Sequence, residues 1–193
     1  MAEDLKHFME EHWIHKAFVL GHSMGGKTAM QFAVDYPDMV DKLIVVDIGP
    51  FSKRGGHGLI FDALLSMNLD EIKSRKEADE VLNIKIPEFG VRQFLLKNLT
   101  RKKEGNYTWK MNLPVLHKEY AEILADVDVN DPFEGETLFI RGAQSNYIEE
   151  KEFSKFKNIF PNAQLETIEK AGHWVHADQP DELLQKVTNF LEE

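Results

Sequence analysis

Short apolar runs alternate with helical patterns over most of this chain. Four runs are typical of buried strands: residues 15–20, 43–48, 137–142 and 164–169. The second of them is rich in β-branched residues, which favour strands. Helical segments precede or follow these runs: residues 2–11, 24–35, 149–160 and 180–191. Strands that alternate with helices predict an α/β fold with a mostly parallel sheet of about four strands.

The pattern changes in the middle of the chain. Between residues 51 and 130 there is little strand signal, and helices are expected over four segments: residues 59–65, 70–82, 89–99 and 117–124. A stretch of this length without structure of its own would be unusual in a compact domain. We therefore expect a helical insertion over residues 51–130, between two halves of an α/β core at residues 1–50 and 131–193.

The most informative motif follows the first expected strand, at residues 21–26 (Gly-His-Ser-Met-Gly-Gly). A strand, a Gly-x-Ser-x-Gly sequence and a helix together are typical of a nucleophile elbow, which exposes its serine on a sharp turn. We expect Gly21 and Gly25 to be glycine because larger side chains would collide across this turn, and Gly26 to let the helix start close to the strand. The alternative is a glycine-rich turn with an incidental serine.

A serine hydroxyl needs a base that accepts its proton, and the best candidate among eight histidines is His173. It comes just after the last expected strand, in the position that the chain order of this fold gives to the base. We expect His176 to face solvent and His22 to shape the elbow. The other histidines have no such setting: His7, His12, His15, His57 and His117.

The acid that orients the base is less obvious. The loop after the third strand, residues 142–147, contains Asn146 but no carboxylate. Asp47 ends the second strand, where an otherwise apolar run would not place a carboxylate without a partner. Asp47 is therefore the candidate acid, and its alternative role is to cap or brace a loop. Three other aspartates precede the third strand, where we expect them to be solvated: Asp126, Asp128 and Asp131.

The composition of the chain excludes several classes of binding partner and site. A formal net charge of −10 over 193 residues argues against general nucleic-acid binding, which needs a basic surface. The absence of cysteine excludes disulfides, thiol catalysis and thiolate metal sites, and we expect no metal. No apolar run is long enough to span a membrane, and the charged, helix-like start is unlike a signal peptide, so secretion is not expected.

With these residues together, the chain resembles the small esterase branch of the α/β-hydrolases, which includes the bacterial YbfF-type esterases and animal abhydrolase domain-containing protein 11. The matching segments are Gly-His-Ser-Met-Gly-Gly-Lys (21–27), Lys-Leu-Ile-Val-Val-Asp-Ile-Gly-Pro (42–50), Gln-Phe-Leu-Leu-Lys-Asn-Leu (93–99), Phe-Ile-Arg-Gly (139–142) and Gly-His-Trp-Val-His (172–176). The resemblance implies a serine hydrolase of short-to-medium acyl esters or thioesters, with a Ser23 acyl-enzyme and no cofactor. It also implies that the acid follows the strand after the elbow, which favours Asp47, and a cytoplasmic or mitochondrial matrix location.

The resemblance also assigns parts of a substrate site. The Met24 backbone N–H would be one donor of the oxyanion hole, and the insertion would be a lid over the acyl pocket. Candidate pocket residues, each of which is also typical of plain core packing, are His22, Phe51, Phe61, Phe94, Trp109 and Trp174. The basic residues 101–103 either steer an anionic substrate or form a solvated turn.

The sequence departs from the family at its beginning. Family members carry an upstream His-Gly segment that supplies the other oxyanion donor, and earlier strands that cover the elbow strand. Neither precedes Ser23 here, so we expect residues 15–20 to form an exposed edge and the chain to self-associate through it. The alternatives to an active esterase are therefore a catalytically impaired, shortened form that acts by binding, or a sequence that is part of a longer esterase.

Overall fold

The computed structural model describes residues 1–52, 56–103 and 105–192. The chain divides into two compact units, which we call the core unit (Met1–Lys53 with Ala125–Glu193) and the insertion unit (Arg54–Leu124). The insertion unit is shorter than the 51–130 segment expected from sequence, because Phe51 and Val127 both pack into a hydrophobic cluster of the core unit.

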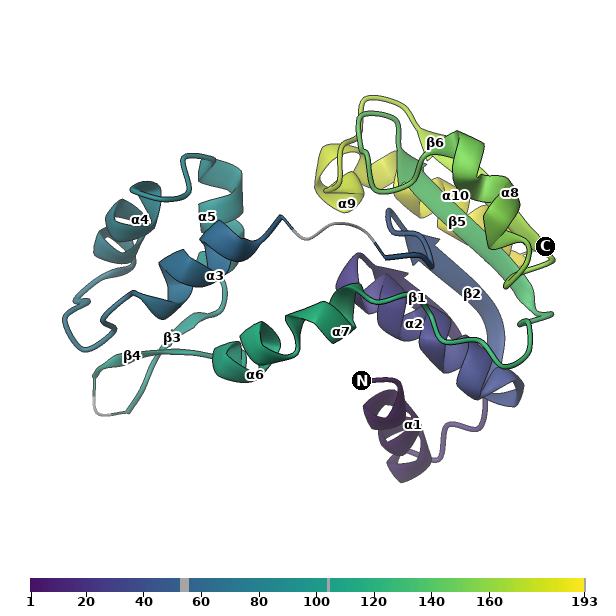
Figure 1. Ribbon diagram of the computed structural model, residues 1–193, viewed down its shortest axis with the longest axis horizontal. Helices are drawn as coiled ribbons and strands as arrows, with labels where there is room; N and C mark the ends of the chain where they lie inside the picture. The colour runs from purple at the N-terminus through teal and green to yellow at the C-terminus, as the bar shows by residue number, and fades with distance from the viewer. Residues whose placement is uncertain (53–55, 104, 193) are drawn as a thin grey trace. The chain divides into compact units, whose positions relative to one another are not determined.

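The core unit is built on one parallel sheet. Its four strands are β1 (Ala17–His22), β2 (Val40–Val46), β5 (Glu136–Gly142) and β6 (Ala163–Ile168), in the order β1-β2-β5-β6 (Figure 1). This confirms the predicted α/β fold with a four-stranded parallel sheet. Because all four strands run the same way, their carboxyl ends lie at one edge of the sheet, where ligand sites of such sheets form.

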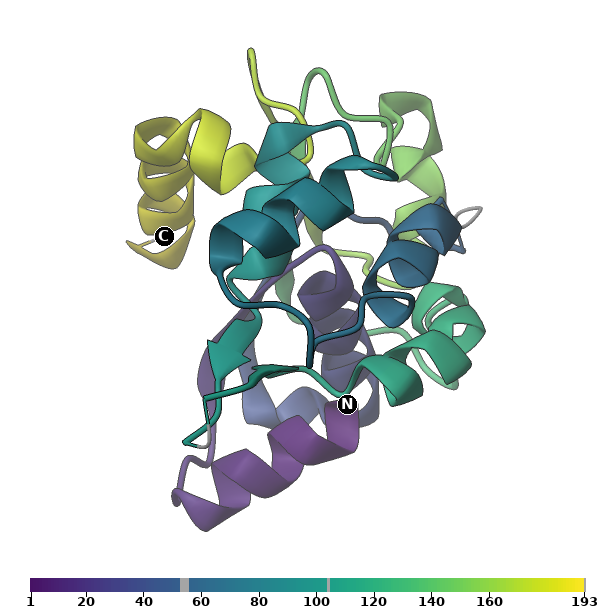
Figure 2. The same cartoon turned by 90° about the vertical axis from the view of Figure 1, so that its left-hand side faces the viewer.

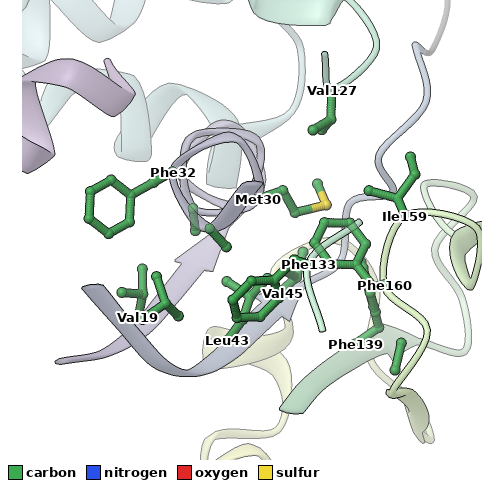
Figure 3. Packing of buried hydrophobic residues seen from close by; sticks show 14 of the residues in the cluster. Val19, Met30, Phe32, Leu43, Val45, Val127, Phe133, Phe139, Ile159 and Phe160 are labelled. Carbon is green, nitrogen blue, oxygen red and sulfur yellow. The ribbon is translucent and has the colours of Figure 1, made fainter. Parts of the chain in front are cut away.

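The two faces of the sheet explain the apolar runs in the sequence. In β2, Leu43 and Val45 belong to the cluster on one face, whereas Ile44 and Val46 belong to the cluster on the other. Side chains alternate between the faces of a strand, so a strand buried on both faces must be apolar at every position. Figure 3 shows the first cluster, in which Leu43 and Val45 lie near Met30, Phe139 and other buried side chains.

Helices α1 (Ala2–Glu11), α2 (Met24–Asp35) and α8 (Phe153–Phe156) contribute to the first cluster. The first two have the bounds expected from sequence, and α1 packs against α2 (Figures 1 and 2). A 3₁₀ turn, η1 (Pro37–Met39), joins α2 to β2. The helix expected over 149–160 is instead a 3₁₀ turn, η2 (Glu150–Glu152), followed by the short α8.

Two helices contribute to the other face. They are α9 (Val175–Asp178) and α10 (Pro180–Glu192), whose buried residues Val175 and Phe190 join the second cluster. At the edge of the sheet this face is open: Phe18 and Leu20 of β1 are 51% and 52% exposed. Within the described ranges, no helix combines the length and apolar character that crossing a bilayer requires.

The insertion unit has its own small hydrophobic cluster. It contains α3 (Gly58–Leu65), α4 (Arg75–Asn83), α5 (Phe89–Leu96), β3 (Leu99–Arg101), β4 (Tyr107–Trp109), α6 (Leu113–Lys118) and α7 (Tyr120–Leu124). The antiparallel pair β3–β4 was not predicted, because three-residue strands are too short for an alternating pattern. Helix α4 begins later than the expected residue 70, because the Ser74 hydroxyl accepts the Glu77 N–H and caps the helix there.

Lys27 anchors the segments of the core unit that lead into and out of the insertion. Its ammonium donates to the carbonyl oxygens of Pro50, Phe51 and Ala125 at 2.7, 3.0 and 2.9 Å. Burial lowers the pKa of Lys27 to about 8, and the charge of Asp126 acts in the opposite direction. The group is therefore mostly charged at pH 7, and its three N–H bonds hold both segments in place on the core unit.

The first cluster gives a test of the fold. Phe139 is fully buried and its ring packs against those of Phe153, Phe156 and Phe160, so Phe139→Ala should lower the free energy of unfolding by about 3–5 kcal/mol. Urea denaturation followed by circular dichroism would measure the change. The matched control is Phe18→Ala on the exposed edge, which should cost at most about 1–2 kcal/mol. Equal losses in the two variants would contradict this packing.

Candidate active site

The turn at Ser23 joins β1 directly to α2. Ser23 has φ 54° and ψ −121°, a strained conformation of the kind found at functional turns. Its backbone N–H donates to the Val46 carbonyl at 3.0 Å, and its carbonyl accepts the Lys27 N–H at 3.1 Å. These bonds fix the turn at the carboxyl end of β1, beside the end of β2.

Close backbone approach explains two of the three glycines of this turn. A Cβ on Gly21 would lie 2.2 Å from the Gly25 carbonyl oxygen, and one on Gly26 would lie 2.5 Å from a methyl carbon of Ile48. The expectation for Gly25 was wrong, because a Cβ there would meet nothing within 4 Å. Gly25 contributes its backbone, not its missing side chain, to the tight contact with Gly21.

Three side chains far apart in the sequence form a chain of hydrogen bonds. Ser23 Oγ lies 3.0 Å from His173 Nε2, and His173 Nδ1 lies 2.8 Å from Asp47 Oδ2. Ser23 follows β1, Asp47 follows β2, and His173 follows β6, so the shared edge of the parallel sheet brings them together. With Nδ1–H donating to the carboxylate, His173 Nε2 is the acceptor for the serine proton.

The Asp47 carboxylate is completely buried. Besides His173 it accepts the Gly142 N–H on Oδ1 at 3.0 Å and the Ser145 hydroxyl on Oδ2. A buried charge is tolerated only with such partners, and these bonds satisfy it from two directions. Asp47 therefore also braces the loop after β5, which was the alternative role expected for it, in addition to contacting His173.

The loop after β5 contributes two residues that were not predicted from the sequence. Ser145 Oγ accepts the Tyr147 N–H at 3.2 Å and donates its own proton to Asp47. The Tyr147 ring stacks on the imidazole of His173, with centroids 4.0 Å apart and planes 21° apart. The only sequence signal for these two residues was their place in the loop where the acid is usually found. In that loop Asn146 was considered, but Ser145 and Tyr147 were not.

The loop that carries His173 is held by one local contact and by contacts with β5 and the loop after it. The Gly172 N–H donates to Asp178 Oδ2 at 2.8 Å, and the Ala171 carbonyl accepts the Gln144 N–H at 2.9 Å. A Cβ on Gly142 would lie 2.3 Å from the Gly172 carbonyl oxygen, so glycine is required for β5 to approach this loop.

His22, which we expected to shape the elbow and also named as a candidate pocket residue, bonds to the protein. Its Nε2 lies 2.8 Å from the His173 carbonyl oxygen, and its ring lies beside those of His173, Trp174 and His176. Burial lowers the pKa of His22, whereas the hydrogen bond to the His173 carbonyl raises it, and the net shift is downward, so the ring is mostly neutral at pH 7. His176 is exposed, and the Trp174 ring lies 6.0 Å from that of His173.

The other candidate pocket residues are spread over both units. Phe51 packs on Phe156 in the core unit. In the insertion unit, the Phe61 ring contacts those of His117 and Tyr120, and Phe94 is exposed on α5. Trp109 lines a groove of about 290 Å³ in that unit. Their contact with substrate, like the lid role of the insertion unit, stays a prediction. Across the described residues, no group of three or more His, Asp or Glu side chains is placed to hold a metal ion.

The sequence matches the family described as "alpha/beta hydrolase fold" over residues 1–180. The chain belongs to this family. It is 38% identical to the sn-1-specific diacylglycerol lipase ABHD11 of Mus musculus, over 99% of this chain and 64% of that protein. Esterase YbfF of Escherichia coli is 34% identical over 99% of this chain and 73% of that protein. The chain thus spans just under two thirds of the mouse relative's length.

A solved structure supports the same assignment. A marine microorganism esterase superposes on this α/β hydrolase with a TM-score of 0.94 and 41% sequence identity. The match covers 98% of this chain and 75% of that one. These findings confirm the resemblance to the YbfF and ABHD11 branch that the motifs indicated.

Substitution of two glycines of the turn should change the free energy of unfolding differently. Gly21→Ala should lower the free energy of unfolding by about 1–3 kcal/mol or more, because its Cβ would collide with backbone atoms. Gly25→Ala should leave stability unchanged or raise it by up to about 1 kcal/mol, because alanine favours a helix and the site is open. Thermal and urea denaturation of the two variants would measure the difference, and a more damaging Gly25→Ala would overturn this description of the turn.

Proposed function

We propose that this α/β hydrolase cleaves carboxylic esters through an acyl-enzyme on Ser23. The observation that supports it best is the hydrogen-bond chain from Ser23 through His173 to Asp47, with donor–acceptor distances of 3.0 and 2.8 Å. Nucleophile, base and orienting acid at such distances are the geometric signature of serine catalysis. The family, and relatives named as an esterase and a lipase, support the same reaction class.

The reaction would proceed in two halves. Ser23 Oγ attacks the acyl carbon while His173 Nε2 takes its proton, and the imidazolium returns that proton to the leaving alcohol as the ester bond breaks. Water then attacks the acyl-enzyme, His173 takes the water proton, and the carboxylic acid leaves as the proton returns to Ser23. The buried Asp47 carboxylate fixes the Nδ1–H tautomer of His173 and stabilises its positive charge.

The backbone N–H of Met24 is the candidate donor to the tetrahedral oxyanion. Met24 is the first residue of α2, and N–H groups in the first turn of a helix have no acceptor within it. The positive end of the helix dipole also points toward this position, which favours a developing negative charge.

The substrate class follows from what the relatives' names share. A diacylglycerol lipase and two esterases all act on acyl groups in ester linkage. We therefore propose acyl esters as substrates, with acyl thioesters as a second group that the same serine chemistry would accept. The short-to-medium acyl length is what the resemblance in the sequence motifs implies.

The nucleophile can be tested with a fluorophosphonate probe and a short-chain p-nitrophenyl ester. The chain should be labelled on Ser23 and should turn over the ester, whereas Ser23→Ala should show neither, because no other hydroxyl is bonded to His173 Nε2 in the described structure. Intact-protein and peptide mass spectrometry would locate the label. Labelling or turnover that persists in Ser23→Ala would refute the proposed nucleophile.

The role of Asp47 has a matched control. Asp47→Asn should lower kcat by about 10⁴-fold, because an amide no longer fixes the correct tautomer of His173 or stabilises its charge. Asp128→Asn removes a carboxylate that lies before β5 in the same unit, and its kcat should match that of the unchanged chain. Steady-state kinetics on the p-nitrophenyl ester compares the two, and an unchanged rate in Asp47→Asn would exclude it as the acid.

We also propose that β1 pairs with a second copy of the chain. It is an edge strand of the sheet, and its Phe18 and Leu20 side chains are about half exposed. An apolar edge strand offers unpaired backbone N–H and C=O groups to another strand. Light scattering should detect dimers or larger species that Leu20→Glu reduces. A monodisperse monomer of the unchanged chain would contradict this pairing.

A further inference from the structure

The side chain of His22 makes a contact that the proposed reaction does not use. Its Nε2 donates to the backbone carbonyl of His173, while the next residue, Ser23, contacts His173 Nε2 through its hydroxyl. We propose that His22 is a positioning residue, which holds the backbone of the base while Ser23 meets its ring. This inference rests on the proposed function of Ser23 and His173.

Two contacts fix the base more firmly than one. Ser23 and Asp47 bond to the imidazole of His173 at 3.0 and 2.8 Å, and Tyr147 stacks on it, but all three contact the ring and not the backbone of this residue. The bond from His22 Nε2 to the carbonyl oxygen of His173, at 2.8 Å, holds the backbone of this residue in addition to its ring. Because residues 22 and 23 are covalently joined on the turn, the nucleophile and the base backbone are then held to one rigid piece of chain.

The other supports of this loop come from different places. Asp178 lies within the same stretch and bonds to the Gly172 N–H, and Tyr147 stacks on the imidazole from the loop after β5. Neither joins the base to the turn that carries the serine. His22 connects the backbone of His173 to this turn, and the connection helps to set the distance between Ser23 Oγ and His173 Nε2 over which the serine proton moves.

The chemistry of the bond suits its place beside the base. A carbonyl oxygen only accepts, so the donating Nε2 of His22 carries a proton. The partly buried ring is neutral, since burial lowers its pKa, and Nδ1 then bears the lone pair. A neutral donor holds the carbonyl without placing a second positive charge beside His173 when that residue takes the serine proton.

Two amide variants separate the positions of the ring nitrogens. The amide nitrogen of Gln is three bonds from Cβ, as Nε2 of His is, whereas the Asn amide reaches only as far as Nδ1. His22→Gln should therefore keep kcat on the p-nitrophenyl ester within about threefold of the unchanged chain. His22→Asn and His22→Phe should lower kcat by about 10- to 100-fold, as a misplaced catalytic group does, with KM within about twofold. Ser23 labelling by the fluorophosphonate should slow in parallel.

The control is His176→Gln. His176 is exposed and touches the His22 ring edge-on, so this change is chemically the same and close by, and kcat should stay within about twofold. Circular dichroism and melting curves of all four variants should overlap closely enough to exclude a general loss of fold.

A second measurement does not depend on turnover. Proton NMR of the imidazoles should show the His173 Nδ1–H, bonded to Asp47, as a strongly downfield signal. The signal should persist in His22→Gln and broaden in His22→Asn. Equal kcat values, or equal signals, for these two variants would overturn the positioning role, and a rise in KM alone would make His22 a substrate contact instead. If Ser23→Ala retains full activity but the NMR contrast holds, the proposed reaction fails and the positioning contact stands.

Discussion

The structure depends most on the burial of one charge, the carboxylate of Asp47. It lies at the end of β2 with no exposed surface, and its donors come from the end of β5, the loop that follows it and the loop after β6. Removing water from a carboxylate is costly, so each of these segments must keep its donor in place. The same requirement that stabilises the sheet edge thus orders the imidazole that faces Ser23.

These hydrogen bonds require backbones to approach more closely than side chains normally allow. Gly21 lies against the Gly25 carbonyl, and Gly142 lies against the Gly172 carbonyl, at distances that leave no room for a Cβ. The first contact forms the turn at Ser23, and the second brings β5 next to the loop of His173. Small residues at two points therefore set the geometry of the proposed site, while the apolar strands between them supply the rigid support.

Elements whose patterns were local and long were predictable. The bounds of α1 and α2 follow from helical periodicity, and the four parallel strands follow from apolar runs. Prediction failed where one hydrogen bond or a few residues decide the outcome. The Ser74 cap starts α4 later than its periodicity suggests, and β3 and β4 are short enough that only their pairing defines them.

The sequence by itself determined the fold class, the turn at Ser23 and the position of His173 after the last strand, because each depends on a local pattern of neighbouring residues. Only the tertiary structure decided which groups surround them. Ser145, Tyr147 and the imidazole of His22 meet Asp47 and His173 across separations of up to 151 residues. No local pattern encodes such contacts, because they depend on the order of strands in the sheet and on where each loop leaves its edge.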